Sequence, residues 1–194
     1  MFSGIVQTTS PILEIEESPQ QRIIWIRTPK GWRLGEGESV CVEGVCSTVQ
    51  RTNRGNFQVI YMAESLRRST LGSLSPRCPV NLERSVALGD LLGGHLVEGH
   101  VDGTARILKV QPEGDAAMYH FGISSRSTRY LVEKGSVAVD GISLTVVKVQ
   151  RARFTASVLS YTRSRTTLGR KGPGDRVNIE FDILAKYVEK LLAR

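Results

Sequence analysis

The strongest constraint on this chain is an internal repeat. The opening segment GIVQTTSPIL (residues 4–13) has nearly the same pattern as GHVDGTARIL (residues 99–108). Sliding one segment over the other pairs Gly4 with Gly99 and Val6 with Val101, and it also pairs a threonine, an isoleucine and a leucine that follow. One short match can arise by chance, so the rest of the chain decides whether the repeat is real.

The remainder of the chain repeats at nearly the same offset. SVCVEGVCSTV (residues 39–49) matches SVAVDGISLTV (136–146), RRSTLG (67–72) matches SRTTLG (164–169), and VNLE (80–83) matches VNIE (177–180). Between residues 39–85 and 136–182, 16 of 47 ungapped pairs are identical. Solenoid repeats have periods of about 20–50 residues, so this longer period predicts two whole domains, over residues 1–95 and 96–182, and a separate terminal segment, 183–194.

The composition is that of an ordinary globular protein, with 40% apolar and 23% charged residues. The chain has no apolar run of about 18 residues for a membrane-spanning helix, and its beginning lacks the basic and apolar regions of a targeting signal. We therefore expect a cytoplasmic protein that binds no membrane. Three cysteines without a CxxC pair argue against disulfides and structural zinc. The net charge of +7 would suit nucleic acid, but with only 6% aromatic residues to stack on bases we expect none.

Short runs rich in β-branched and aromatic residues, bounded by turn residues, predict strands in both repeats. They cover residues 23–27, 39–42, 46–49, 57–62 and 80–82, and then 118–123, 136–139, 143–149, 154–159 and 176–179. Glu43-Gly44 and Asp140-Gly141 each separate two apolar runs, which is typical of a two-residue β-hairpin turn. Regularly spaced short strands predict an all-β protein, an antiparallel barrel or sandwich.

The clearest predicted helix is the C-terminal segment DILAKYVEKLLAR (residues 182–194). Its apolar residues recur along one face, and Asp182 is the expected N-cap. A stripe of this kind must be buried on a barrel or against other copies of itself. Shorter helices are predicted to begin at Thr28-Pro29 and to cover residues 127–134.

Taken together, these motifs resemble the riboflavin synthase family of tandem lumazine-binding domains. The resemblance covers essentially the full length. It is carried by MFSGIV, GGHLVEGHVDGTA (residues 93–105), the EGVCSTV and DGISLTV turns, the two TLG segments and VNIEFDILAKYVEKLL. It implies two tandem six-stranded Greek-key antiparallel barrels related by internal duplication, plus a C-terminal α-helix that serves oligomerisation.

The resemblance also implies a reaction, the final step of riboflavin biosynthesis. Two molecules of 6,7-dimethyl-8-ribityllumazine exchange a four-carbon unit, giving riboflavin and 5-amino-6-(D-ribitylamino)uracil without a cofactor or metal. Two copies of one substrate need two pockets of one design, which a duplicated barrel supplies. The family is a homotrimer with its productive site between the first barrel of one subunit and the second barrel of its neighbour, and an association with lumazine synthase is left open. The alternative function is a non-catalytic lumazine- or flavin-binding protein of the same fold.

Three residues are predicted to be catalytic: Cys46, His100 and Ser143. Cys46 occupies the position that Ser143 has in the second repeat, and a basic neighbour would favour its thiolate. The thiolate could add to the electrophilic ring carbon, orient a water molecule that does so, or only form a hydrogen bond; the structural alternative is a small packing residue. His100, paired with Ile5, could move the proton of the acidic 7-methyl group or be a structural histidine. His95 is interpreted as a turn residue.

The predicted substrate contacts lie at the barrel mouths or in the opening segment of each repeat. Glycine backbone can approach a flat heterocycle there, while polar side chains bind its edge or the ribityl chain. The first repeat contributes Phe2, Gly4, Ile5, Val6, Ser39, Val45, Ser47, Met62, Glu64 and Ser65. The second repeat contributes Gly99, Val101, Lys134, Ile142, Leu144, Thr145, Leu159, Tyr161, Thr162 and Asp182. Glu43, Ser47 and Tyr161 depart from the residues usual in the family.

Overall fold

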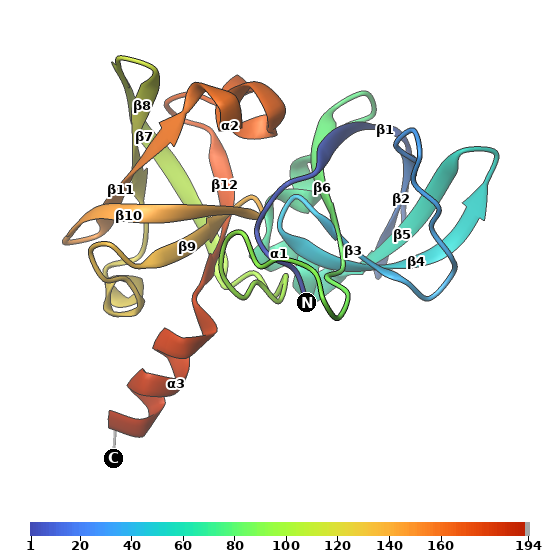
Figure 1. Ribbon diagram of the computed structural model, residues 1–194. Helices are drawn as coiled ribbons and strands as arrows, with labels where there is room; N and C mark the ends of the chain where they lie inside the picture. Colours follow the sequence, from blue (N-terminus) through green and yellow to red (C-terminus); the bar gives the residue numbers. More distant parts are fainter. Residues whose placement is uncertain (193–194) are drawn as a thin grey trace.

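The computed structural model describes residues 1–192 and consists of two barrels that lie side by side and a helix that extends from the second (Figure 1). The first barrel closes in the order β1-β2-β5-β4-β3-β6. Its strands are β1 (Thr8–Glu17), β2 (Gln21–Arg27), β3 (Ser39–Val42), β4 (Val45–Asn53), β5 (Asn56–Met62) and β6 (Pro79–Arg84). The second barrel comprises β7 (Gly103–Glu113), β8 (Ala116–Gly122), β9 (Ser136–Val139), β10 (Ile142–Gln150), β11 (Arg153–Leu159) and β12 (Arg176–Phe181).

The two barrels have one topology. The second closes in the order β7-β8-β11-β10-β9-β12, which is the order of the first with each strand number raised by six. In both, the second strand pairs with the fifth instead of the third, a Greek-key connection, and neighbouring strands are antiparallel. The prediction of two duplicated six-stranded barrels is therefore confirmed.

The sequence runs predicted only five strands in each repeat. The sixth is the strand that begins each repeat, β1 and β7, and both of these strands contain a proline, Pro11 and Pro112. Proline cannot donate to a ladder and argues against a central strand. Here both prolines lie near the end of a ladder, since Pro11 opposes Pro79 in the last pair of β1 with β6 and Pro112 opposes Ala117 beside the β7–β8 turn.

The helices are short except for the last. They are α1 (Ala63–Arg68), α2 (Ser160–Arg165) and α3 (Ile183–Leu192), with 3₁₀ turns η1 (Thr70–Ser73), η2 (Ser125–Tyr130) and η3 (Thr167–Arg170). The prediction of a helix beginning at Thr28-Pro29 is wrong, because only a turn follows there, and the helix predicted over residues 127–134 is replaced by the earlier and shorter η2. Within residues 1–192, no helix is long and apolar enough to cross a bilayer.

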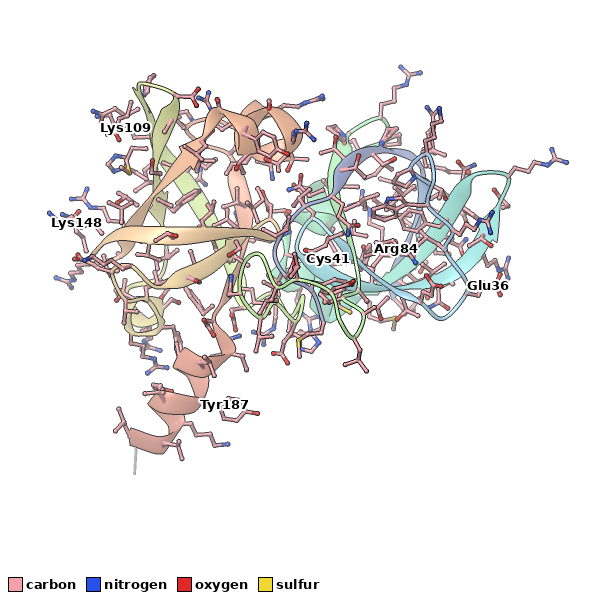
Figure 2. All side chains as sticks on the ribbon, in the orientation of Figure 1. Glu36, Cys41, Arg84, Lys109, Lys148 and Tyr187 are labelled. Atoms are coloured by element: carbon pink, nitrogen blue, oxygen red, sulfur yellow. The ribbon has the colours of Figure 1, made fainter. Side chains whose placement is uncertain are left out.

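The N-cap prediction for the last helix is confirmed, since the Leu184 N–H donates to Asp182 Oδ1 at 2.9 Å. The helix predicted over residues 182–194 begins at Ile183, and its last two residues lie outside the described part of the chain. Along α3 the apolar side chains remain exposed in the single chain, and Tyr187 projects into solvent (Figure 2).

Each barrel is filled by its own apolar core. Alternating residues of the strands point inward, as Ile24 and Ile26 do on β2 and as Phe154 does on β11. The rings of Phe121 and Phe154 stack with centroids 4.9 Å apart. Since a fully buried side chain of this size contributes about 1.5–3 kcal/mol, each domain has the apolar burial that a separate core requires.

A small third core joins the barrels around a pseudo-twofold axis. Phe2 and Val97, which occupy equivalent positions in the two repeats, form an antiparallel bridge in which each N–H donates to the other's carbonyl, at 2.7 and 3.1 Å. Cys41 and its counterpart Ala138 are buried beside them, and Cys41 lies at the junction in Figure 2. Burial raises the pKa of the Cys41 thiol, so this cysteine is a packing residue, as its position in a strand indicated.

The two predicted hairpin turns meet back to back on this axis. Glu43-Gly44 and Asp140-Gly141 have positive φ at all four residues, the conformation expected of such turns. A Cβ atom on Gly44 would lie 2.6 Å from the backbone nitrogen of Gly141. Only glycine permits this approach, so the motif is needed both for the turn and for the contact between barrels.

The sequence VN-E occurs once in each repeat, at residues 80–83 and 177–180. The two asparagines of this VN-E motif hold the turns reciprocally. Asn81 donates its backbone N–H to the Glu43 carboxylate at 2.7 Å and its side-chain amide to the Asp140 carbonyl at 2.9 Å. Asn178 mirrors this, donating to the Asp140 carboxylate and to the Glu43 carbonyl, both at 2.7 Å. Each barrel therefore hydrogen-bonds its own turn and that of its twin.

One charged group breaks the symmetry. Lys171 Nζ donates to Glu43 Oε1 at 2.9 Å and to Asp140 Oδ2 at 2.6 Å. Thr167 also donates to Glu43, whereas its twin Thr70 leaves a buried hydroxyl without a partner, because aspartate is one methylene shorter than glutamate. A single cation thus pairs with two buried carboxylates, one from each barrel.

Replacing Lys171 with methionine should lower the unfolding free energy by about 3–5 kcal/mol near neutral pH, because removing one partner of a buried ion pair leaves an uncompensated charge. Burial raises the pKa of Asp140 to about 7, against the opposing effect of Lys171. A carboxyl group whose pKa is higher in the folded than in the unfolded chain stabilises the folded protein at acidic pH. This stabilisation is lost as the pH rises toward the pKa of the folded state. The cost of Lys171→Met should therefore be smaller at a pH of about 5 than at about 8, and urea unfolding at both measures it.

Lys148→Met is the matched control, because Lys148 is exposed on the outer side of the second barrel (Figure 2). It should leave the unfolding free energy within about 0.5 kcal/mol. Equal losses in the two variants would contradict the role given to Lys171.

Candidate functional site

The opening segment of each repeat crosses to the other barrel; these crossing segments are residues 3–6 and 98–101. Cys46, at the start of β4 in the first barrel, donates its N–H to the Gly99 carbonyl of the second repeat at 2.8 Å. Ser143, at the equivalent place on β10, donates to the Gly4 carbonyl at 2.7 Å. Val101 packs against the first core and Val6 against the second. Each candidate pocket therefore combines residues of both repeats.

Two buried glutamates of the VN-E motif anchor the crossing segments. Glu83 accepts hydrogen bonds of 2.7 and 3.1 Å from the backbone N–H groups of residues 3–4. Glu180 accepts bonds of 2.7 and 2.9 Å from those of residues 98–99. Burial raises the pKa of both carboxyls, while these hydrogen bonds favour the charged form. The repeated asparagine and glutamate thus hold the turn and the crossing segment of each repeat.

Gly99 is required by this crossing. It has φ of 77°, as its twin Gly4 has, and a Cβ atom on it would lie 2.5 Å from the Cys46 nitrogen and 2.7 Å from the Cys46 Cβ. The sequence analysis predicted that glycine backbone approaches a bound heterocycle here. In the structure the close approach of Gly99 is to the start of β4.

A cavity of about 320 Å³ lies where Cys46 faces the crossing segment. Seven predicted site residues line it: Val45, Cys46, Glu64, Ser65, Gly99, His100 and Val101. Arg68, Ser69 and Asp102 complete the lining and were missed. The spacing of Arg68 from Glu64, four residues along a helical turn, was the one sequence signal available for them.

Cys46 and His100, the two residues at which the repeats differ most informatively, are brought to the same cavity. Cys46 is half-buried with a free thiol, and it points outward from β4 because the strand alternates. The neighbouring Ser47 points inward instead and bonds to the Tyr61 hydroxyl at 2.7 Å. The His100 side chain is 69% exposed and its Nδ1 lies 3.7 Å from Glu98, so it is free to reach a ligand.

The carboxylate in the cavity is fixed by arginines. Glu64 lies in the first turn of α1 and pairs with Arg68, whose Nε lies 2.5 Å away, and with Arg67. These hydrogen bonds, that from Arg68 first, lower the pKa of Glu64. Glu64 is therefore a carboxylate at neutral pH, an acceptor for ribityl hydroxyls or ring N–H groups.

The same positions in the second barrel carry different chemistry. Ser143 replaces Cys46 and Ile5 replaces His100. Tyr161 replaces Glu64, and the Arg165 guanidinium lies over its ring, 4.5 Å from the centroid. The second barrel thus offers hydroxyl groups and an aromatic face at the positions where the Cys46 cavity has a thiol, an imidazole and a carboxylate.

The other predicted contacts follow the strand and helix geometry. Met62 and Leu159 are exposed N-caps of α1 and α2, with Thr162 in the first turn of α2. On β10, Thr145 points outward with Ser143, whereas Ile142 and Leu144 belong to the core. The structure therefore brings four predicted first-repeat residues, at 45–46 and 64–65, together with residues 99–101 of the second repeat in one cavity. It distributes the predicted residues of β10 and α2 over the mouth and inner wall of the second barrel.

The remaining predicted contacts lie away from the Cys46 cavity. Phe2 is buried between the barrels, and Ser39 begins β3, where its carbonyl accepts from Ser85 at 2.9 Å. Lys134 is exposed and has φ of 67°, in the position that glycine has in the first repeat, Gly37 with φ of 85°.

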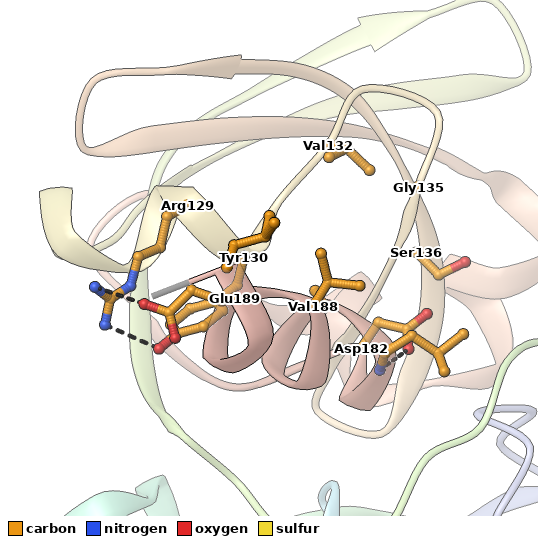
Figure 3. A pocket seen from close by; sticks show the side chains of 11 residues that line it. Arg129, Tyr130, Val132, Gly135, Ser136, Asp182, Val188 and Glu189 are labelled. Carbon is orange, nitrogen blue, oxygen red and sulfur yellow. Dashed lines mark hydrogen bonds and ion pairs between the residues drawn. The ribbon is translucent and has the colours of Figure 1, made fainter. Parts of the chain in front are cut away.

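A larger cavity of about 570 Å³ lies between α3 and η2 (Figure 3). Arg129 and Glu189 pair across it at 3.0 Å, and Val132 and Val188 contribute apolar wall. Asp182 and Ser136, the twin of Ser39, lie at one side of it. It contains none of the three predicted catalytic residues, whereas the smaller cavity contains Cys46 and His100. Residues 1–192 hold no cluster of three or more His, Cys, Asp or Glu side chains arranged for a metal ion.

The duplicated barrels, with the Cys46 cavity where the two repeats meet, define a protein of two lumazine-binding domains. The family described as "Lumazine binding domain" matches residues 3–85 and 98–182. Over 197 residues the chain is 44% identical to riboflavin synthase of Mycobacterium tuberculosis, covering 99% of this chain and 98% of the relative. It is 38% identical to riboflavin synthase of Actinobacillus pleuropneumoniae, with 100% and 91% covered. The chain belongs to the riboflavin synthase family, and the members to which it is similar are transferases.

Solved structures agree on the fold. The chain superposes on LumP complexed with 6,7-dimethyl-8-(1'-D-ribityl) lumazine with a TM-score of 0.84 at 24% identity, covering 93% of this chain and 98% of that one. It superposes on LumP complexed with riboflavin with a TM-score of 0.86 at 23% identity, covering 93% and 99%.

Gly99→Ala should lower the unfolding free energy by about 1–3 kcal/mol, because the added Cβ overlaps the start of β4 and forces backbone to move. It should also weaken ligand binding at the Cys46 cavity, since the crossing segment forms one wall. Gly103→Ala is the matched control, because nothing lies within 4 Å of a Cβ atom there. Chemical unfolding and a fluorescence titration with riboflavin measure the two effects; a Gly99→Ala variant as stable as Gly103→Ala would contradict the close approach.

Proposed function

We propose that this protein catalyses the riboflavin synthase reaction, in which two molecules of 6,7-dimethyl-8-ribityllumazine give riboflavin and 5-amino-6-(D-ribitylamino)uracil. The observation that carries the proposal is that Cys46 and His100, contributed by different repeats, line one cavity in a duplicated barrel. The reaction transfers four carbon atoms between two identical molecules, so its atoms and electrons balance without an oxidant or reductant. The residues of the two barrels therefore need to supply only binding, orientation, proton transfer and a nucleophile or a site for one.

In this proposal the first barrel holds one lumazine against the crossing segment. The Cys46 thiol faces the electrophilic ring carbon, as a thiolate that adds to it or that orients water toward it. His100 moves the proton of the 7-methyl group, which its exposed imidazole is free to reach. The Glu64 carboxylate and the Ser65 hydroxyl bind the polar edge of the same molecule.

The second barrel holds the other lumazine by a different set of groups. Ser143 and Thr145 face outward from β10, and Ser143 lies against the crossing segment, its N–H bonded to the Gly4 carbonyl. Lys134 donates to a ring carbonyl. Its positive φ is uncommon for a residue with a side chain and is more often retained at functional sites than elsewhere.

We further propose that the protein is a homotrimer with its productive site between the first barrel of one copy and the second barrel of the next. The exposed stripe of α3, formed by Leu184, Tyr187, Val188 and Leu191, supports an interface that buries it. The spacing of these residues, three and four apart, suits packing against other helices.

The remaining proposals concern the setting of the protein. Three free cysteines suit a reducing compartment, so we place the protein in the cytoplasm. The substrate is the product class of lumazine synthase, and an association with that enzyme would shorten its transfer. We propose no nucleic acid or membrane partner.

Purified protein mixed with the ribityllumazine should produce riboflavin, and Cys46→Ser should reduce kcat by about 10²-fold, since a hydroxyl at this position is a much weaker nucleophile and acid–base group. Riboflavin fluorescence measures the rate. Cys78→Ser is the matched control, because Cys78 precedes β6 away from the cavity, and it should retain full activity. Tight binding of the lumazine without turnover in the unmodified protein would instead identify the non-catalytic binder.

Leu191→Glu should convert the trimer to monomers, because a charge would be buried in the α3 interface. Sedimentation measures the change. Lys190→Glu, at the adjacent and exposed position, is the control and should remain trimeric. Identical sedimentation of the unmodified protein and the Leu191→Glu variant would refute the α3 interface.

A further inference from the structure

The start of β10 in the second barrel has a histidine contact that the start of β4 in the first barrel does not. His95 is 8% exposed, and its Nδ1 lies 2.7 Å from the Oγ of Ser143. Within residues 1–192, no histidine ring makes a corresponding hydrogen bond to Cys46, the twin of Ser143. His95 was interpreted from the sequence as a turn residue, and the mechanism above does not use it.

The surrounding backbone holds His95 in this place. Its N–H donates to the Ser3 carbonyl at 3.1 Å. The preceding Gly94 passes so close that a Cβ atom on it would lie 2.2 Å from the same carbonyl oxygen and 2.8 Å from the Ser143 Cβ. The linker between the barrels therefore fits against Ser143 only because residue 94 is glycine. The position of the His95 side chain thus depends on the backbone contacts of residues 94–95 as well as on its hydrogen bond to Ser143.

Electrostatics favours a neutral imidazole here. Burial lowers the pKa of His95, and the carboxylate of Asp182 opposes that shift only in part. A neutral imidazole has one donor and one acceptor nitrogen. With its proton on Nε2, His95 accepts at Nδ1 a hydrogen bond that the Ser143 hydroxyl donates, and the lone pairs of the serine oxygen remain available.

We propose that His95 is a positioning residue for Ser143, which it orients so that the serine oxygen accepts a hydrogen bond from the lumazine held at the second barrel. This inference rests on the proposed function and deepens it. The first barrel offers a thiol beside an exposed imidazole, whereas the second offers a hydroxyl group whose direction is fixed by a hydrogen bond. The two substrate molecules must play different parts in the reaction, and this contact makes the twin pockets unequal.

The test is a double-mutant cycle with a conservative rescue. His95→Phe keeps a planar ring and removes the hydrogen bond, so kcat should fall by about 10- to 100-fold, as expected for a misplaced active-site group. Ser143→Ala should give a similar loss, and the double variant should be no slower than Ser143→Ala, because residues that act through one contact are not additive. His95→Asn should retain most of the activity, since its Oδ1 is two bonds from Cβ, as Nδ1 is.

His120→Phe is the matched control, because His120 lies on β8 of the same barrel and should leave kcat unchanged. Losses that multiply in the double variant, or a His95→Asn variant as slow as His95→Phe, would overturn the inference. If His95→Phe does not fold, His95→Gln, whose amide lies one bond farther out, takes its place in the cycle. Absence of turnover in the unmodified protein would overturn the proposed function instead; the same cycle measured on riboflavin affinity would then still decide the role of His95.

Discussion

The contact between the Glu43-Gly44 and Asp140-Gly141 turns is the constraint on which the rest of the molecule depends. The turns approach so closely that neither glycine has room for a side chain, and the asparagines of the VN-E motif hydrogen-bond across them. Each turn leads within two residues to the start of a strand, and those strands carry Cys46 and Ser143. Fixing the turns therefore fixes the separation of the two pockets, and the glutamates of the same motif fix the crossing segments that complete them.

The sequence predicted the architecture because its signals are local and doubled. The repeat, the two Asp/Glu-Gly turns and the apolar runs specify two similar barrels, and comparison of the repeats singled out Cys46 and His100, which the structure places in one cavity. The crossing of the opening segments could not be predicted, because periodicity in one strand contains no information about which barrel receives it. The partners of Lys171 and His95 likewise come together only in the folded chain, across 128 and 48 residues of sequence.

The departures from symmetry are as informative as the symmetry. Two equal pockets would bind two lumazines in equal states, whereas transfer of carbon atoms from one to the other needs unequal environments. The chain differs between its halves at Cys46 and Ser143, at His100 and Ile5, and at Glu64 and Tyr161. These positions flank the pockets, while Gly4 and Gly99, Asn81 and Asn178, and Glu83 and Glu180, which build the frame, are unchanged. Duplication has therefore preserved the frame and varied the chemistry.

The symmetric contacts also explain why the two halves must be joined. Phe2 pairs with Val97, its own equivalent, and the glycine turns meet their equivalents, which is the pattern of an isologous dimer interface. A homodimer of single repeats could make the same contacts, but every substitution would then occur in both pockets at once. Covalent linkage removes that restriction, because a residue can change in one half alone. Lys171 shows the consequence at the axis itself: one lysine serves two carboxylates, an arrangement that a symmetric dimer would double and so overcrowd. The linker that joins the halves also brings His95 to Ser143, so the same segment that permits asymmetry supplies part of it.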